Sequence, residues 1–355
     1  MRLLVITNDY PPKPGGIQMY LGNLLAAYDG ESMVIAPHDT DVPSEETNVV
    51  RGNQRYMLPG KETKALVSHT IDSFEPDAVL FGAPHPLPQL GPWMRETFGV
   101  PFGILNHGAE VTIPGSIPGS RQLLGRTLAA ADVRFAVSRF TARKVTAVAK
   151  RPTNLLGAGV DIGTFTPADI KPRRDVPVVG CVSRFVPRKG QSRLLRAVAE
   201  LDRDVQVVFV GKGRDETKLR RLAQRLDVNV RFEVGVEWSA LPGLYRSMDI
   251  FCMPCSSRWG GLEVEGLGLV FLEAAASGLP VLAGDSGGSP ETVLPGETGF
   301  VVSSVSDITD GLTILLDDPS KAESMGHAGR QFVEAEFTWD RVVERLHVGF
   351  APHMR

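Results

Sequence analysis

Residues 176–190 read VPVVGCVSRFVPRKG, an apolar run that leads directly into a basic loop stiffened by proline. The run has the length and composition of a buried strand, and the loop lies where a helix is expected to begin. Short apolar runs of this kind alternate with helical patterns along nearly the whole chain, which is typical of parallel sheets covered by helices. We therefore predict an α/β fold built on parallel strands.

The expected strands form two sets, one in each half of the chain. The first set lies at residues 3–7, 32–36, 78–81, 102–106, 134–138 and 154–156, and the second at 176–182, 205–210, 230–234, 250–253, 281–283 and 300–302. Because 355 residues exceed the usual size of one core, we predict two domains, 1–166 and 167–336, with a linker at Pro167 to Pro177. A last helix carries an apolar stripe from Trp339 to Phe350 and must dock onto a part that is already folded.

Composition narrows the classes of function. A formal net charge of −3 does not favour a nucleic-acid-binding protein. The chain has no apolar run near the roughly 20 residues needed to cross a bilayer. Three cysteines are too few for a disulfide framework, which fits a reducing cytoplasm. Residues 111–160, however, hold many bases and a single acid, Asp132, which predicts an anionic partner; a solvated face paired with acids from elsewhere is the alternative.

The segment after the first strand, residues 7–18, reads TNDYPPKPGGIQ and opens the first helix. Gly15 and Gly16 leave no side chains at the helix start, so backbone N–H groups and the positive helix end can form an anion cradle there. The segment lacks the three spaced glycines of dinucleotide sites, which disfavours NAD binding. A simple tight turn is the alternative interpretation.

Three further segments carry candidate site residues. Arg184 and Lys189 suit a diphosphate leaving group, whose negative charge grows as the bond to it breaks. Glu265 lies on a glycine-rich loop and Glu273 about one turn into the next helix, so one carboxylate can hold sugar hydroxyls while the other binds a ribose diol. His107 ends a strand, where active-site groups collect in open α/β sheets.

Taken together, these segments resemble the family 4 retaining glycosyltransferases. The motifs that match, in that family's order, are Tyr10 to Gly16, His107 to Glu110, Ser183 to Gly190, Glu265 to Glu273 and Gly287 to Glu291. The run from Met253 to Glu273 is most similar to actinobacterial GDP-mannose-dependent phosphatidylinositol mannoside mannosyltransferases, and the resemblance covers nearly the whole chain.

This resemblance implies the GT-B fold, in which two Rossmann-like domains face a central cleft. Residues 1–166 would be the acceptor-side domain, joined by the C-terminal helix 337–355, and residues 167–336 would bind the nucleotide sugar. The implied catalytic residues are His107 against the sugar, Arg184 and Lys189 on the diphosphate, and Glu265 on mannose hydroxyls. The other implied donor contacts are Gly15 and Gly16 near the phosphate and acceptor, Glu273 on the ribose, Gly211 and Val236 near the base, and backbone groups of Leu269, Val270 and Phe271.

The resemblance also implies a reaction and its partners. GDP-mannose would be the donor substrate in a front-side displacement that needs no metal and no resident cofactor. The sequence Asp202-Arg203-Asp204 matches the Asp-x-Asp of metal-dependent transferases, but no strand precedes it, so we interpret it as a turn. The implied acceptor is a phosphatidylinositol mannoside-type lipid. Arg121, Arg126 and Ile117 would face an anionic phospholipid surface at the inner side of the cell membrane, with the protein a monomer or weak dimer.

Three alternatives remain open. The same fold could use another nucleotide sugar or a soluble acceptor such as an inositol phosphate. A nucleotide-sugar epimerase and a catalytically silent lectin-like module are the other two, and the combination of Arg184, Lys189, Glu265 and Glu273 argues against both.

Overall fold

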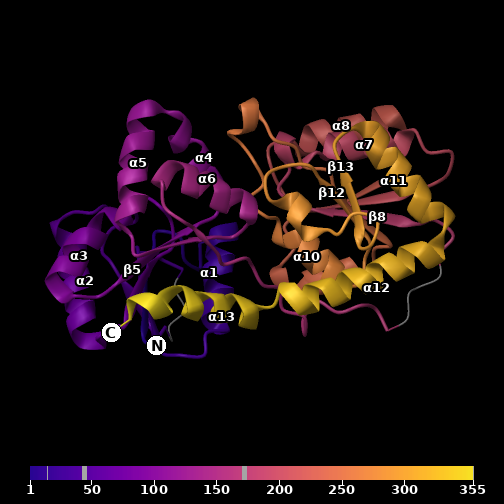
Figure 1. The fold of residues 1–355 in the computed structure, drawn as a ribbon. Coiled ribbons are helices and arrows are strands. Elements are labelled where there is room, and N and C mark those ends of the chain that lie inside the picture. Colours follow the sequence, from indigo (N-terminus) through magenta and orange to yellow (C-terminus); the bar gives the residue numbers. More distant parts are fainter. Residues whose placement is uncertain (14, 42–45, 170–173, 355) are drawn as a thin grey trace. The chain divides into compact units, whose positions relative to one another are not determined.

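The computed structural model describes residues 1–13, 15–41, 46–169 and 174–354. The chain divides into two compact units, unit 1 with Met1–Ala158 and Trp339–Arg355, and unit 2 with Gly159–Thr338 (Figure 1). Unit 1 ends earlier than the boundary expected at residue 166, because the Arg330 guanidinium of unit 2 donates to the carbonyls of Ile162 and Phe165. The linker expected at Pro167 to Pro177 includes residues 170–173, which lie outside the described residues.

Unit 1 contains, within its described residues, a seven-stranded parallel sheet in the order β3-β2-β1-β4-β5-β6-β7. The strands are β1 (Leu3–Ile6), β2 (Ser32–Ala36), β3 (Val49–Arg51), β4 (Ala78–Phe81), β5 (Phe102–Asn106), β6 (Val133–Ala136) and β7 (Asn154–Leu155). Sequence patterns identify all of them except β3, a three-residue edge strand that is only partly buried and so has no marked apolar run. The helices are α1 (Gly16–Ala26), α2 (Lys61–Phe74), α3 (Gly91–Phe98), α4 (Ala109–Thr112), α5 (Pro118–Ala130), α6 (Arg139–Ala149) and α13 (Trp339–Phe350).

Unit 2 contains, over the part of it that the structure describes, a six-stranded parallel sheet in the order β10-β9-β8-β11-β12-β13. The strands are β8 (Val178–Val182), β9 (Gln206–Val210), β10 (Val230–Glu233), β11 (Ile250–Met253), β12 (Val281–Gly284) and β13 (Gly299–Val302), all within two residues of their expected bounds. The helices are α7 (Gln191–Ala199), α8 (Glu216–Leu226), α9 (Leu241–Arg246), α10 (Leu269–Ala276), α11 (Val305–Asp317) and α12 (Pro319–Glu336). Figure 1 shows α7, α8 and α11 on one side of this sheet and α10 and α12 on the other.

The last helix, α13, belongs to unit 1, where it packs against α1 (Figure 1). All members of its apolar stripe are buried: Trp339, Val342, Val343, Leu346 and Phe350. The Phe350 ring lies 5.5 Å from that of Phe135 on β6, and a Cβ on Gly103 of β5 would come within 2.8 Å of it. Gly103 therefore leaves the space that the end of α13 fills, which confirms that the C-terminal helix docks onto the N-terminal sheet.

The position of Phe350 predicts a stability effect that is local to unit 1. Phe350→Ala should lower the free energy of unfolding by about 3–5 kcal/mol, because the ring is fully buried and its loss leaves a cavity beside Gly103. Val348→Ala on the same helix is the matched control, since 67% of Val348 is exposed, and it should change stability by less than about 0.5 kcal/mol. Chemical denaturation followed by circular dichroism measures both, and equal effects of the two substitutions would contradict this packing.

Candidate active site

In unit 1 the segment after β1 is fixed by the buried side chain of Asn8. Its amide donates to the carbonyl of Met57 (3.0 Å) and accepts from the Met57 N–H (2.7 Å). Next to it, Gln18 of α1 donates from Nε2 to Asp9 Oδ1 at 2.7 Å. A Cβ on Gly15 would lie 2.1 Å from Oε1 of Gln18, so a side chain at this position would displace Gln18. Gly15 thus leaves room for the Gln18 side chain that bonds to Asp9.

The start of α1 at Gly16 is open. A Cβ on Gly16 would meet nothing within 4 Å, and no side chain caps this helix end among the described residues. The first backbone N–H groups of a helix have no partner within the helix, so the anion site expected at this end stays a prediction. Pro14, which belongs to the same motif, lies outside the described residues.

His107 follows β5 at the carboxyl edge of the same sheet, where its ring is held on two sides. Its Nε2 lies 3.0 Å from the carbonyl oxygen of Gly82, and its ring lies edge-on to Tyr20 at 5.2 Å. Burial lowers the pKa of His107, against the raising effects of Glu110, the Gly82 carbonyl and Asp9, which favours the neutral imidazole at pH 7. Since a carbonyl only accepts, Nε2 carries the proton and Nδ1 is left as an acceptor.

Glu110, the acid that follows His107, accepts hydrogen bonds from the backbone. One carboxylate oxygen, Oε1, accepts from the N–H groups of His107 and Gly108, the second at 2.9 Å, directly before the short helix α4. Gly108 has a backbone φ of +135, a value that residues other than glycine rarely adopt. The turn from β5 into α4 is therefore fixed by Gly108 and Glu110, and it sets the direction of the His107 side chain.

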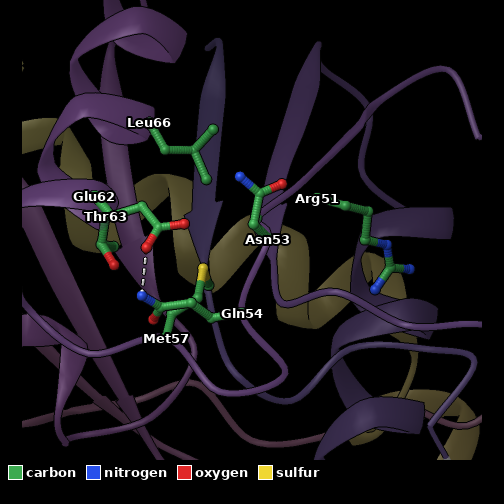
Figure 2. A pocket seen from close by; sticks show the side chains of 8 residues that line it. Arg51, Asn53, Gln54, Met57, Glu62, Thr63 and Leu66 are labelled. Atoms are coloured by element: carbon green, nitrogen blue, oxygen red, sulfur yellow. Dashed lines mark hydrogen bonds between the residues drawn. The ribbon is translucent and has the colours of Figure 1, made fainter.

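A pocket of about 230 Å³ lies between the end of β3 and the start of α2. Its lining is mixed, with polar groups of Asn53, Gln54, Glu62 and Thr63 and apolar groups of Met57 and Leu66 (Figure 2). Gln54 donates to Glu62 at 2.6 Å. Arg51 points away from that pair in Figure 2, and it binds Glu46 at 2.7 Å and the Pro11 carbonyl at 2.6 Å. The pocket thus adjoins the Tyr10 to Gly16 loop through Arg51 and Asn8.

In unit 2 the loop after β8 ends in a short 3-10 turn, Pro187–Lys189, that brings two cations onto one carboxylate. Lys189 Nζ lies 2.8 Å from Oε2 of Glu265, and the Arg188 guanidinium contacts the same oxygen. Burial acts to raise the pKa of Glu265, but Lys189 and Arg188 outweigh it and hold the pKa below its usual value. Glu265 is therefore ionised at neutral pH and keeps both cations in place.

The charge balance around this carboxylate is positive. Arg188 also lies 3.8 Å from Glu263, and Arg258 pairs with Glu263 at 3.2 Å. Three cations against two carboxylates leave a local charge of +1 before Arg184 is counted. An excess of positive charge of this kind favours an anionic partner.

The backbone of Glu265 is held by the loop after β12. The Glu265 N–H donates to Ser286 Oγ at 3.1 Å, and the Gly288 N–H donates to the Glu265 carbonyl at 2.9 Å. Gly287 has φ +61, and a Cβ there would lie 2.0 Å from the Glu265 carbonyl oxygen. The Gly287 to Glu291 motif therefore positions the carboxylate by packing directly against its main chain.

The other expected donor contacts come from the loops after β8, β9 and β10 and from α10. The Arg184 side chain is exposed, Val236 is partly buried, and a Cβ on Gly211 would lie 2.2 Å from the Ser183 carbonyl, so Gly211 packs directly on the Arg184 loop. Leu269, Val270 and Phe271 form the first turn of α10, and Glu273 follows about one turn into this helix, as expected. Gly268, directly before this turn, lies close to Glu265, because a Cβ there would come within 3.5 Å of the Glu265 Cγ.

Glu273 has a partner of its own. Its Oε2 accepts a hydrogen bond from Tyr245 Oη at 2.7 Å. Burial raises the pKa of Glu273 to about 7, although the bond from Tyr245 acts in the lowering direction. The two carboxyl groups therefore differ in protonation at pH 7: Glu265 is ionised, whereas Glu273 is about half protonated.

The basic side chains of residues 111–160 in unit 1 include both exposed and buried ones. Arg121 and Arg126 on α5 are exposed, as are the apolar side chains of Ile113, Ile117 and Leu123. Arg134, in contrast, is buried and donates to the backbone carbonyls of Ala131 (2.6 Å) and Pro152 (2.8 Å). Helices α5 and α6 pack together.

Two further features bear on sequence-based expectations. Asp202 and Asp204 lie in the bend before β9, at the opposite end of the sheet from Lys189, which agrees with their interpretation as a turn. In residues 1–13, 15–41, 46–169 and 174–354, no group of three or more His, Cys, Asp or Glu side chains is arranged to hold a metal ion. Within those same ranges, no helix has the length and apolarity to cross a bilayer.

Comparisons with known proteins agree with this architecture. The sequence pattern of the family described as glycosyl transferases group 1 matches residues 164–332. In solved structures, HepE of Anabaena bound to UDP aligns with a TM-score of 0.83 at 19% identity, covering 99% of this chain and 100% of that one. Sucrose-phosphate synthase of Thermosynechococcus elongatus aligns with a TM-score of 0.80 at 21% identity, covering 99% and 98%. These likenesses show the GT-B fold.

Sequence relatives narrow the family further. One relative is the GDP-mannose-dependent monoacylated alpha-(1-6)-phosphatidylinositol monomannoside mannosyltransferase of Corynebacterium glutamicum. This chain is 39% identical to it, and the alignment covers 97% of this chain and 96% of the relative. This chain is also 37% identical, over 97% of each chain, to the GDP-mannose-dependent alpha-(1-6)-phosphatidylinositol monomannoside mannosyltransferase of Mycobacterium tuberculosis. Two parallel Rossmann-like sheets, with a cationic site at the carboxyl edge of the second, define a GT-B glycosyltransferase. The chain belongs to the group 1 glycosyl transferases, family 4 of the glycosyltransferases.

Sequence reasoning missed two residues of the site. Arg188, and not Arg184, shares Glu265 with Lys189. Its place next to Lys189 was a signal, because both cations lie on the short loop that follows β8. Tyr245, the partner of Glu273, comes from α9, and no sequence pattern links the two positions.

The raised pKa of Glu273 predicts a pH-dependent stability. The folded protein holds the Glu273 proton up to a pH of about 7, whereas the unfolded chain releases it near 4.5, so stability is lost as pH rises between these values. The loss is on the order of 3 kcal/mol. Glu273→Gln should therefore be relatively more stable at pH 8 than at pH 4.5, compared with the wild type.

Tyr245→Phe serves as the matched variant for this prediction. It removes the hydrogen bond that lowers the pKa of Glu273, so the midpoint of the pH effect should move upward. Thermal unfolding of the three proteins from pH 4 to 9 measures the effect. Parallel profiles for wild type and Glu273→Gln would show that Glu273 does not titrate in this range.

Proposed function

We propose that this protein is a retaining, metal-independent mannosyltransferase that moves mannose from GDP-mannose to a phosphatidylinositol mannoside-type lipid. The observation that carries the proposal is the 37–39% identity over 97% of the chain to enzymes named for this donor and acceptor. The anion site of unit 2 supports the donor class, since Lys189 and Arg188 lie at a carboxyl strand end with positive charge in excess.

In the proposed reaction, the bond between the anomeric carbon and the β-phosphate oxygen breaks, and its electron pair leaves with GDP. The acceptor hydroxyl attacks from the same face, and its proton passes to the departing phosphate. Arg184, Arg188 and Lys189 stabilise the charge that develops on the diphosphate, which is the work a metal ion does in other transferases. The diphosphate takes over both cations of Glu265, so the carboxylate becomes free to accept hydrogen bonds from mannose hydroxyls.

The remaining donor contacts are assigned as follows. Glu273 accepts from the ribose diol, Leu269, Val270 and Phe271 present backbone groups to the donor, and Gly211 and Val236 border the base. Gly15 and Gly16 approach the phosphate and the acceptor from unit 1. His107 contacts the transferred sugar, where a neutral imidazole with Nδ1 as acceptor suits a hydroxyl donor. For the polar head of the acceptor, unit 1 offers the pocket of Asn53, Gln54 and Glu62.

A transfer assay with the full chain tests this function. Label from GDP-mannose should enter an organic-extractable lipid when vesicles contain the mannosylated phosphatidylinositol acceptor, and UDP-glucose, UDP-GlcNAc and ADP-glucose should give little product. Activity should survive EDTA, because the cations at the diphosphate site are side chains. Label in an inositol phosphate instead of lipid would assign a soluble acceptor, an altered sugar nucleotide formed without acceptor would assign an epimerase, and loss on chelation would overturn metal independence.

Lys189→Ala should reduce turnover by about ten- to a hundredfold, since a hydrogen bond to a charged group contributes roughly 1.5–3 kcal/mol. Arg184→Ala should reduce turnover by a similar factor, because the guanidinium of Arg184 is proposed to bind the diphosphate. Lys218→Ala, an exposed lysine on α8, is the matched control and should leave turnover unchanged. Wild-type turnover in either of the first two proteins, with intact thermal unfolding, would remove that residue from the diphosphate site.

We also propose that the exposed bases and apolar side chains around α5 bind an anionic membrane. Each base near such a surface contributes about 1 kcal/mol, so a few suffice for reversible binding that salt weakens. Charge reversal by Arg121→Glu with Arg126→Glu should abolish co-sedimentation with phosphatidylinositol vesicles. Arg221→Glu with Arg225→Glu on α8 of unit 2 makes the same charge change and should have little effect. Binding that ignores 0.5 M salt or the first pair of substitutions would argue against this surface.

A further inference from the structure

A loop between β11 and Glu265 presents a tryptophan to solvent. Residues 258–263 close on themselves through paired backbone bonds between Arg258 and Glu263, at 2.9 and 3.3 Å. Trp259, Gly260 and Gly261 at its tip have φ values of +50, +64 and +89. Two glycines adopt this left-handed region readily, but a bulky indole does not. The loop therefore holds Trp259 in a conformation that its own side chain disfavours.

The indole gains little packing in return. Trp259 is 65% exposed, and the contact described for its ring is with the guanidinium of its neighbour Arg258, 5.0 Å from the ring centroid. A strained backbone that presents a large apolar ring to water is unfavourable in the free protein. Such features persist where the ring has a ligand, so the geometry points to a binding role.

The base of the loop is joined to the diphosphate site. Arg258 pairs with Glu263 at 3.2 Å, and Glu263 lies 3.8 Å from Arg188, which itself contacts Glu265. The Ser256 N–H donates to the Arg188 carbonyl at 2.9 Å. The tryptophan loop is thus anchored on both sides to the residue that shares Glu265 with Lys189. A ligand that lies on the indole borders the site assigned to the donor.

We propose that Trp259, flanked by Arg258, is a stacking platform for a sugar ring of the acceptor, an inference that rests on the proposed mannosyl transfer. A hexose presents C–H groups on one face, and these pack favourably on an aromatic ring, while the adjacent guanidinium can donate to ring hydroxyls. The donor sugar is assigned to Glu265, whose side chain is only 12% exposed. The exposed indole of Trp259 therefore lies farther out, where a ring of the acceptor can bind.

An acceptor sugar fits this platform better than a membrane does. Residues 258–263 contain one other large apolar side chain, Leu262, and it is only partly exposed, so the loop offers little exposed apolar area beyond the indole. A surface that inserts into lipid carries several apolar side chains together, as around Ile113, Ile117 and Leu123 of unit 1. The loop is also electrostatically joined to the diphosphate site through Glu263 and Arg188, a contact that a membrane anchor does not require.

Trp259→Gly provides a test in which loss of the fold is not the expected cause. Glycine accepts a φ of +50, so this substitution removes the ring and relieves the backbone. The KM for the mannosylated lipid acceptor should rise about tenfold, while the KM for GDP-mannose and the affinity for GDP stay within about twofold. Trp259→Phe should retain most of the acceptor affinity, because a smaller aromatic face remains. Ile314→Ala, an exposed apolar side chain on α11, is the control and should match the wild type.

The outcomes separate the two proposals. A wild type that forms no mannosylated lipid would overturn the proposed function itself. A wild type that transfers mannose, together with an unchanged acceptor KM in Trp259→Gly, would overturn the platform alone. Reduced binding of Trp259→Gly to phosphatidylinositol vesicles that lack the sugar would identify the indole as a membrane contact, and an equal rise in both KM values would make it part of the donor site; either result would overturn the proposal.

Discussion

The shared contact of Arg188 and Lys189 with Glu265 organises the carboxyl edge of unit 2. A buried carboxylate without cations is strongly unfavourable, and so are buried cations without a carboxylate. Each partner comes from a different segment, because the cations follow β8 and Glu265 precedes α10. The loop with Ser286 and Gly288 then fixes the carboxylate's main chain. The position of each loop therefore depends on the charges that the others supply.

This arrangement bears on how the proposed donor would bind. Glu265 holds Arg188 and Lys189 in place within unit 2. On the proposed function, a diphosphate exchanges with Glu265, and the carboxylate released in this exchange meets the hydroxyls of the sugar. No large rearrangement of unit 2 is needed for these steps, because the cations are already oriented by the 3-10 turn at Pro187.

The carboxyl edge of the sheet in unit 1 differs from that of unit 2 in the polarity of its groups. The groups at its carboxyl edge are mostly neutral or belong to the backbone, as with Asn8 on Met57 and His107 on the Gly82 carbonyl. Its carboxylates there, Glu110 and Asp9, are bonded to the backbone and to Gln18. A neutral imidazole and open helix amides suit uncharged hydroxyls and a phosphate edge, whereas the ion pairs of unit 2 suit a leaving group that gains charge. The division of polarity between the units therefore matches the division of labour in the proposed transfer.

The sequence by itself determined the fold class, the positions of the described strands other than the edge strand β3, and the segments expected to carry the site. Apolar runs bounded by glycine, proline and charged residues mark buried parallel strands, because such strands need apolar side chains on both faces. Only the tertiary structure decided which side chains meet. It placed Arg188 with Lys189, gave Glu273 to Tyr245, buried Arg134 among backbone carbonyls, and left Trp259 exposed on a left-handed turn. The reason is physical: spacing along the chain fixes the edge of the sheet at which a residue lies, whereas partners and pKa values depend on segments that are distant in sequence.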